Sequence, residues 1–213
     1  MPVCRTTLLA LLSLALLATP PSQAQGITVT AYGGWRGSGE GLQRSAPGDP
    51  AARLGSGPAA SISIDWTIDA ARQLQLFGSH QQTELETSNG SGAGAGAGTP
   101  LRVPLKLSTL QLGGTNFIDG RVGNGTYVVG GLGVTQLSPG LAGFESELRL
   151  SLSLGLGYQW PLSTGLSLRT EVRGWGTLIN SGGSFLCSGG CTVSIKGETL
   201  TQVEALLGLA WSF

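Results

Sequence analysis

Charged side chains are scarce in this sequence. They make up 11% of its 213 residues, whereas soluble domains have about a quarter. Twelve lysine and arginine residues balance twelve aspartate and glutamate residues, so the chain has no net field that would attract nucleic acid. The sequence also contains no basic patch. We therefore expect no nucleic-acid partner.

Long hydrophobic runs are also missing, except near the N-terminus. There Arg5 precedes an apolar core of eleven residues from Leu8 to Ala18, and Pro20 and Pro21 end the run. The following Ser-Gln-Ala, residues 22–24, offers the small residues that a signal peptidase reads. We expect residues 1–24 to be a signal peptide and 25–213 to be one exported domain. A membrane anchor is the alternative, but a spanning helix needs about twenty apolar residues.

Cysteine is nearly absent from the exported domain. Cys187 and Cys191 are its only two cysteines, and Ser-Gly-Gly separates them. An even number of cysteines in an exported chain permits a disulfide, and two glycines let the Cα atoms come within bridging distance. A metal pair is the alternative, but two thiolates without a nearby histidine or acidic cluster make a poor site. We expect a disulfide, and neither a metal nor a cofactor.

The chain is rich in glycine and in alternating apolar and polar residues. Its 36 glycines follow no Gly-X-Y repeat, which excludes collagen. In the clearest alternating segment, the leucines from Leu148 to Leu156 share one face, and Glu147 and Arg149 begin the other. This period of two predicts β-strands. We expect eight of them, at 27–35, 61–69, 72–80, 108–117, 125–137, 146–160, 165–178 and 203–213.

Such alternation fits either a soluble β-sandwich or a membrane barrel. Most of the runs are as long as a tilted strand that crosses a bilayer, and their better-defined polar faces carry charged and small residues. The connections also alternate in length: 69–71, 119–124 and 161–165 are short, whereas 36–58, 87–100, 138–145 and 179–196 are mostly long. The pattern favours an all-β fold, an eight-stranded antiparallel up-and-down transmembrane barrel with its short turns in the periplasm.

Charged residues gather on the predicted inward faces. The inward set comprises Asp65, Glu147, Arg149, Arg169, Glu171, Arg173, Gln202 and Glu204. The last three strands are neighbours, so their charges can pair across strands. A buried charge without a partner costs several kcal/mol, and the bore of an eight-stranded barrel is only wide enough for side chains. We interpret the charges as a structural network in the lumen. A gated path for a small solute is the functional alternative.

His80 is the only histidine and the only candidate for acid–base catalysis by an imidazole. Ser79 is adjacent along the strand and so points to the opposite face. Glu84 shares the face of His80 but lies about 13 Å away, at roughly 3.3 Å per residue. A partner on another strand is invisible in the sequence. We expect His80 to be a rim residue and the protein not to be an enzyme; a lipid-modifying enzyme that uses His80 is the alternative.

Several segments resemble a known group of proteins. They are "AYGGWRGSG", "YVVGGLGVTQLSP", "SLSLGLGYQWPLSTGLSLRTEVRGWGTL" and "FLCSGGCTVSIKGETLTQVEALLGLAWSF". With them, the mature chain resembles the small proteobacterial outer-membrane β-barrel proteins grouped with the OmpA-, OmpX- and OmpW-like barrels. The resemblance implies an eight-stranded barrel but no reaction.

The C-terminal strand carries a further likeness to these barrels. Their last strand typically ends in an aromatic residue after alternating apolar residues, and the barrel-assembly machinery reads it. The matching residues here are Val203, Leu207, Leu209, Trp211 and Phe213. The resemblance implies a monomer in the bacterial outer membrane, surrounded by lipid and lipopolysaccharide. We expect a non-enzymatic structural or surface-interaction role, or alternatively a narrow OmpW-like channel for small solutes.

Overall fold

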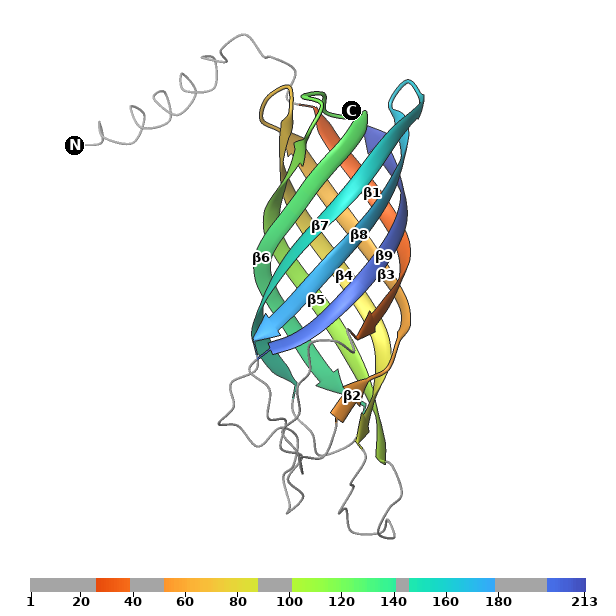
Figure 1. Cartoon of the computed structure of the whole chain (residues 1–213), viewed down its shortest axis with the longest axis vertical. Coiled ribbons are helices and arrows are strands. Elements are labelled where there is room, and N and C mark those ends of the chain that lie inside the picture. Colours follow the sequence, from red (N-terminus) through yellow and green to blue (C-terminus); the bar gives the residue numbers. More distant parts are fainter. Residues whose placement is uncertain (1–25, 39–51, 88–100, 141–145, 179–198) are drawn as a thin grey trace, which may run out of the picture.

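The structure, a computed structural model, describes residues 26–38, 52–87, 101–140, 146–178 and 199–213 (Figure 1). The strands are β1 (Ile27–Ser38), β2 (Ala52–Leu54), β3 (Gly57–Thr67), β4 (Arg72–Thr87), β5 (Leu101–Phe117), β6 (Gly125–Pro139), β7 (Glu147–Ser163), β8 (Leu166–Leu178) and β9 (Thr199–Ser212). Among these residues, no helix has the length and hydropathy needed to span a membrane.

The strands form one antiparallel sheet that closes on itself. Their order around the wall is β4-β3-β1-β9-β8-β7-β6-β5, and β5 pairs back with β4. The three-residue β2 pairs with the far end of β4, beyond the end of β3. The wall therefore consists of eight strands, and the predicted fold class is confirmed.

The strands are staggered around the wall. If each residue is followed to its partner on the next strand, a path that starts at Ser38 returns to β1 at Thr28, ten residues away. It passes through Gln202, Trp175, Ser153, Gly131, Gly113, Gln75 and Asp65. Such a stagger goes with a strand tilt of roughly 40°, and eight strands enclose a bore that side chains fill.

The two ends of the barrel differ in their connections. Residues 68–71, 118–124 and 164–165 join strands at one end, where the C-terminus also lies (Figure 1). We call this the turn end and the opposite one the loop end. The third turn is shorter than predicted because β7 continues through Pro161 with a register shift. The predicted signal peptide, residues 1–24, and the predicted disulfide, Cys187–Cys191, lie outside the described residues.

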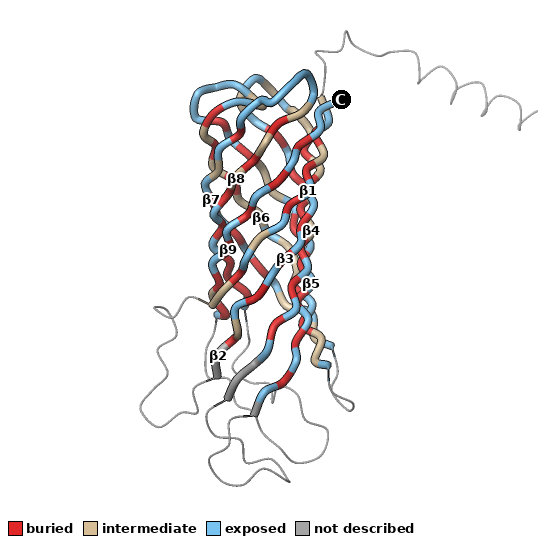
Figure 2. Tube along the Cα trace, turned by 90° about the vertical axis from the view of Figure 1, so that its right-hand side faces the viewer, coloured by how far each residue is buried: buried red, intermediate tan, exposed pale blue. Residues whose placement is uncertain are grey.

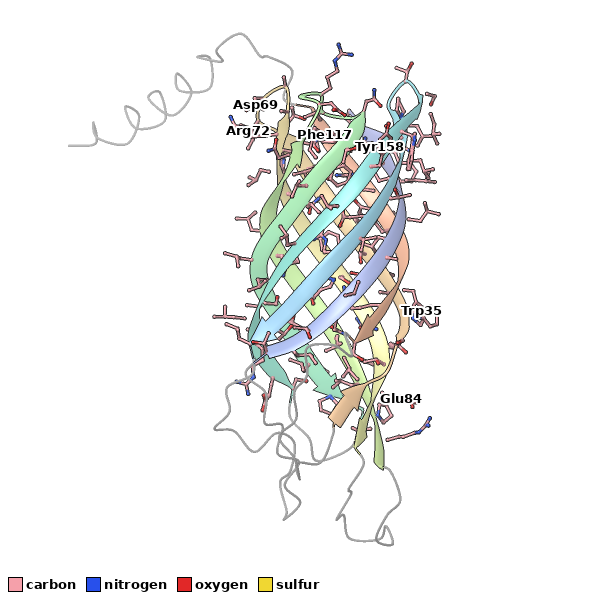
Figure 3. The ribbon with its side chains drawn as sticks, in the orientation of Figure 1. Trp35, Asp69, Arg72, Glu84, Phe117 and Tyr158 are labelled. Carbon is pink, nitrogen blue, oxygen red and sulfur yellow. The ribbon has the colours of Figure 1, made fainter. Side chains whose placement is uncertain are left out.

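Asp69 organises the turn between β3 and β4. Its Oδ1 accepts hydrogen bonds from the backbone N–H groups of Ala71 at 2.9 Å and Arg72 at 2.8 Å, and its Oδ2 accepts one from Arg72 Nε at 2.7 Å. The Arg72 side chain and then the Ala71 N–H stabilise the carboxylate, so the pKa of Asp69 lies below its ordinary value. Both side chains lie at the turn end in Figure 3. A bond from Val122 N–H to the Ala70 carbonyl, 2.7 Å long, joins this turn to the next one.

The β4–β5 hairpin reaches further toward the loop end than the predicted strands 72–80 and 108–117. In this extension Val103, Leu105 and Leu107 point inward and are buried, whereas Arg102 and Lys106 point outward and are exposed. Closer to the turn end the outward face of β5 is apolar, with Leu110 and Leu112. The alternation thus reverses within the strand, which is why the sequence pattern suggested a shorter one.

Over most of the wall, burial is the inverse of that in a soluble protein. Exposed and buried residues alternate along the strands in Figure 2. The outward side chains of Leu132 and Leu148 are 70% and 65% exposed, whereas those of Asp65 and Arg169 are fully buried. The apolar residues face out and the polar ones face in, as in a barrel that is surrounded by lipid.

Candidate functional site

Three arginine–carboxylate pairs lie in the bore. They are Arg169 Nη1–Asp65 Oδ2 at 2.9 Å, Arg173 Nε–Glu171 Oε1 at 2.6 Å and Arg36 Nη2–Glu204 Oε2 at 2.7 Å. None of the six side chains is more than 1% exposed in these pairs. Charges buried this deeply persist only when they are paired and hydrogen-bonded.

Strand β8 sets the levels of these pairs along the bore. Its inward residues are Arg169, Glu171, Arg173 and Trp175, because every second side chain of a strand shares a face. β8 runs from the turn end to the loop end, so Arg169 lies nearest the turns and Trp175 nearest the loops. Trp175 is the cross-strand neighbour of Gln202, whose strand also carries Glu204. The three pairs therefore occupy successive levels from one end to the other.

An aromatic ring stacks on each guanidinium. Arg169 lies 4.7 Å from the centroid of Tyr127, and Arg173 lies 3.9 Å from that of Phe77. Arg36 lies 4.2 Å from the centroid of Trp175. A cation over an aromatic face contributes about 2 kcal/mol or more when both groups are desolvated.

Polar side chains connect the first two pairs, and Trp175 adds a hydrogen bond to the third. Gln75 donates to Asp65 Oδ1 at 2.8 Å and accepts from Arg173 Nη2 at 3.1 Å, so it joins the first two pairs. The Tyr127 hydroxyl donates to Glu171 Oε2 at 3.1 Å. Trp175 Nε1 donates to Glu204 Oε2 at 2.8 Å. These bonds join the first two pairs into one network, and the third pair adjoins it through the Trp175 ring, whose centroid lies 5.6 Å from the Arg173 guanidinium.

Two tyrosines in the bore lie over glycines of the next strand. Tyr127 is paired with Gly157, and Tyr32 with Gly208. A Cβ on Gly157 would lie 2.6 Å from Cε2 of Tyr127, and one on Gly208 would lie 2.8 Å from Cε1 of Tyr32. The missing side chains make room for the rings, in the manner of aromatic–glycine cross-strand pairs.

The structure brings together five of the seven predicted charged residues: Asp65, Arg169, Glu171, Arg173 and Glu204. Glu147 and Arg149 instead pair with each other near the loop end, where their side chains are 29% and 21% exposed. Gln202 is buried and donates to Gln81 at 3.2 Å.

The pairing geometry differs from the cross-strand pairs expected on the last three strands. Arg169 reaches Asp65 across the bore, from β8 to β3, and Arg173 bonds Glu171 on its own strand. A narrow bore makes this possible, because an extended arginine side chain spans much of its width.

Sequence reasoning missed Arg36, which it placed at the start of a loop. Arg36 is the direct cross-strand neighbour of Glu204. Thr28, Thr30 and Tyr32 already alternate inward on β1. Had that period been continued, Arg36 would have been placed on the inward face.

Ser108 was also missed. The structure places His80 on the outward face of β4, with its Nδ1 3.0 Å from Ser108 Oγ on β5. The two residues are direct cross-strand neighbours. Their register is set across a connection of thirteen residues, 88–100, so no local signal in the sequence reveals the pair.

The residues of the predicted assembly signal line the outward face of β9. Val203, Leu207, Leu209 and Trp211 are 41–56% exposed, and Phe213 follows the strand at 84%. Other outward aromatics share the turn end, such as Tyr158 and Trp160, with ring centroids 4.3 Å apart. Figure 3 shows Tyr158 at this end and Trp35 toward the other.

Within the described ranges, no group of three or more His, Cys, Asp or Glu side chains is arranged to hold a metal ion. The buried charges of the bore are instead matched in three arginine–carboxylate pairs.

No protein-family model and no curated protein matches the sequence. The structure is similar to that of the outer membrane protein OprG from Pseudomonas aeruginosa, with a TM-score of 0.56 and 12% identity over 89% of this chain and 96% of that one. Neisserial surface protein A gives a TM-score of 0.48 at 14% identity, over 88% of this chain and 96% of that one. The outer membrane protein AlkL gives 0.47 at 14% identity, over 92% and 94%. The chain therefore has the fold of the small eight-stranded outer-membrane barrels.

Proposed function

We propose that this protein is an integral outer-membrane barrel with a closed lumen, and that it has a structural or surface-interaction role. The outer wall supports the membrane location. Leu150, Leu152, Leu154 and Leu156 of β7 are each 45–65% exposed in one unbroken row. Water would solvate such a row poorly, whereas lipid covers it. The turn end would face the periplasm and the loop end the exterior.

The buried ion pairs in the bore are the observation that carries the proposal. Arg36, Arg169 and Arg173 are buried at three levels, and each is paired and stacked. An ion would have to break these contacts to pass, and each such break leaves a charge unpaired in a medium of low dielectric constant. A barrel of this kind acts through its outer surface and its loop end.

Conductance tests this directly. The purified protein in a planar lipid bilayer is expected to give no steady current above that of the protein-free bilayer. An Arg173→Ala variant, which removes the central guanidinium, serves as the comparison in which the bore has been opened to ions. A steady, concentration-dependent current through the unmodified protein would contradict a closed lumen.

A second candidate is uptake of small apolar solutes, and one observation favours it. Between the charged pairs and the loop end, the inward residues Leu105, Leu107 and Leu137 are buried and form an apolar section of the bore. A small apolar molecule would be retained there by burial of its surface. Quenching of a bound apolar fluorophore, lost in a Leu107→Asn variant, would support this candidate over a purely structural role.

We also propose that the C-terminal strand guides assembly. Phe213→Ala is expected to reduce the share of protein that becomes a heat-modifiable barrel in the outer membrane, measured by gel mobility with and without boiling. Trp160→Ala is the matched control, because it removes an exposed aromatic from the same end of another strand. Equal losses in both variants would point to the aromatic belt in general and against a recognition signal.

A further inference from the structure

The outward face of the β4–β5 hairpin changes character at one level. From the turn end, β5 presents Leu112 and Leu110 outward, and then Ser108 and Lys106. The inward face changes in the opposite sense, from Gln111 and Thr109 to Leu107 and Leu105. Because apolar side chains face lipid within the membrane and face the interior outside it, this reversal marks where the wall leaves the hydrocarbon layer.

His80 and Ser108 form the first polar row beyond the leucines. They are opposite each other on β4 and β5, both exposed, with Nδ1 and Oγ 3.0 Å apart. The next row pairs Gln82 with Lys106, and both residues are exposed. Further out, Glu84 and Arg102 form an exposed pair at 3.6 Å, and Figure 3 shows Glu84 near the loop end. A serine hydroxyl in contact with an imidazole is the basic unit of an activated nucleophile.

We propose that Ser108 and His80 are a nucleophile and its general base, and that they cleave ester-linked acyl chains of lipids in the outer leaflet. This goes beyond the proposed function, which requires no chemistry. The site selects its substrate by its depth in the membrane, because the ester carbonyls of a lipid lie between its hydrocarbon and its head group. Lys106, exposed one row further out on the same strand, places a positive charge on the side of the pair where a lipid phosphate would lie.

The reaction balances with water as the second substrate. His80 Nδ1 takes the proton of Ser108 while Oγ bonds to the acyl carbonyl carbon. The ester C–O bond then breaks, and the imidazolium gives its proton to the departing lipid hydroxyl. Water attacks the acyl-serine, with His80 again accepting a proton, and the fatty acid leaves as Ser108 regains its hydrogen.

The test uses the full-length protein in vesicles of phosphatidylethanolamine and lipopolysaccharide, with free fatty acids measured by mass spectrometry. Ser108→Ala and His80→Ala are each expected to lower the release at least about 100-fold, the usual contribution of such groups. Ser138→Ala is the control, because Ser138 is a partly exposed serine that bonds Ser146 at 2.9 Å instead of a histidine. Gel mobility of unboiled samples verifies that every variant has folded.

A serine-directed phosphonate probe gives a second measurement that needs no variant of Ser108. Peptide mapping is expected to find the probe on Ser108 of the unmodified protein, and much less of it in His80→Ala. Acyl chains missing from lipopolysaccharide alone, or from phosphatidylethanolamine alone, would identify which lipid supplies the ester. Release that equals that of protein-free vesicles, release that Ser108→Ala leaves unchanged, or absence of the probe from Ser108 would overturn the proposal.

Discussion

Replacing Glu204 with alanine is expected to lower the free energy of unfolding by about 3–5 kcal/mol, the usual cost of removing one partner of a buried ion pair. The Arg36 guanidinium would stay buried without its carboxylate, with only the 2.6 Å bond to Ser79 to replace the 2.7 Å contact with Glu204. Trp175 Nε1 would lose its acceptor as well. The change thus leaves one charge and one donor unsatisfied in the bore.

The measurement is the urea dependence of the folded fraction in lipid vesicles, read from gel mobility. Glu84→Ala is the matched control, because Glu84 is also paired with an arginine, but with both side chains more than half exposed. An exposed pair contributes at most about 1 kcal/mol. If the two variants were equally stable, the bore would have to relax or admit water around Arg36. The proposal of a closed lumen would then lose its main evidence.

A double variant, Arg36→Met with Glu204→Leu, separates the pair from its packing. Removing both charges also removes their desolvation cost, so this variant is expected to be as stable as the unmodified protein or more so. That result would mean that each of the two charges destabilises the barrel when its partner is removed, but that the barrel folds without the pair. A double variant as unstable as Glu204→Ala would assign the loss to Trp175 instead, through the stacking of Arg36 on its ring and the N–H that loses Glu204 as its acceptor.

The membrane-facing wall could be predicted from the sequence, because its signal is local. The leucines of β7 alternate with polar residues without interruption, so period, strand length and face all follow from a single stretch. The same logic placed Arg169, Glu171 and Arg173 inward, since they alternate on one strand.

Contacts between strands could not be predicted in this way. The Arg169–Asp65 pair joins residues 104 positions apart, and the His80–Ser108 pair joins residues 28 apart. Each depends on the register between strands and on the stagger of the whole barrel, and no short segment contains either. The reversal of faces on β5 was missed for a related reason, because a period-two pattern that changes phase looks like the end of a strand.

Replacing Gly157 with alanine is expected to lower the free energy of unfolding by about 1–3 kcal/mol, the range for overpacking a filled interior. The new methyl group would lie 2.6 Å from Cε2 of Tyr127 and closer still to its Cζ and hydroxyl oxygen. The ring has little freedom to move, because its hydroxyl bonds Glu171 at 3.1 Å and Arg169 Nε at 3.3 Å. Displacing Tyr127 therefore disturbs two of the three ion pairs as well.

Gly33→Ala is the control, since a Cβ there meets no atom within 4 Å. In a strand it is expected to be neutral, or to gain about 0.4–1 kcal/mol because the unfolded chain loses freedom. The same unfolding measurement compares the two variants. If the two variants changed the free energy of unfolding equally, the effect would reflect only the general preference of strands for residues larger than glycine. A loss confined to Gly157→Ala would mean that the glycine is required by one ring, and that the packing of the bore is set by Tyr127 together with the arginines that it contacts.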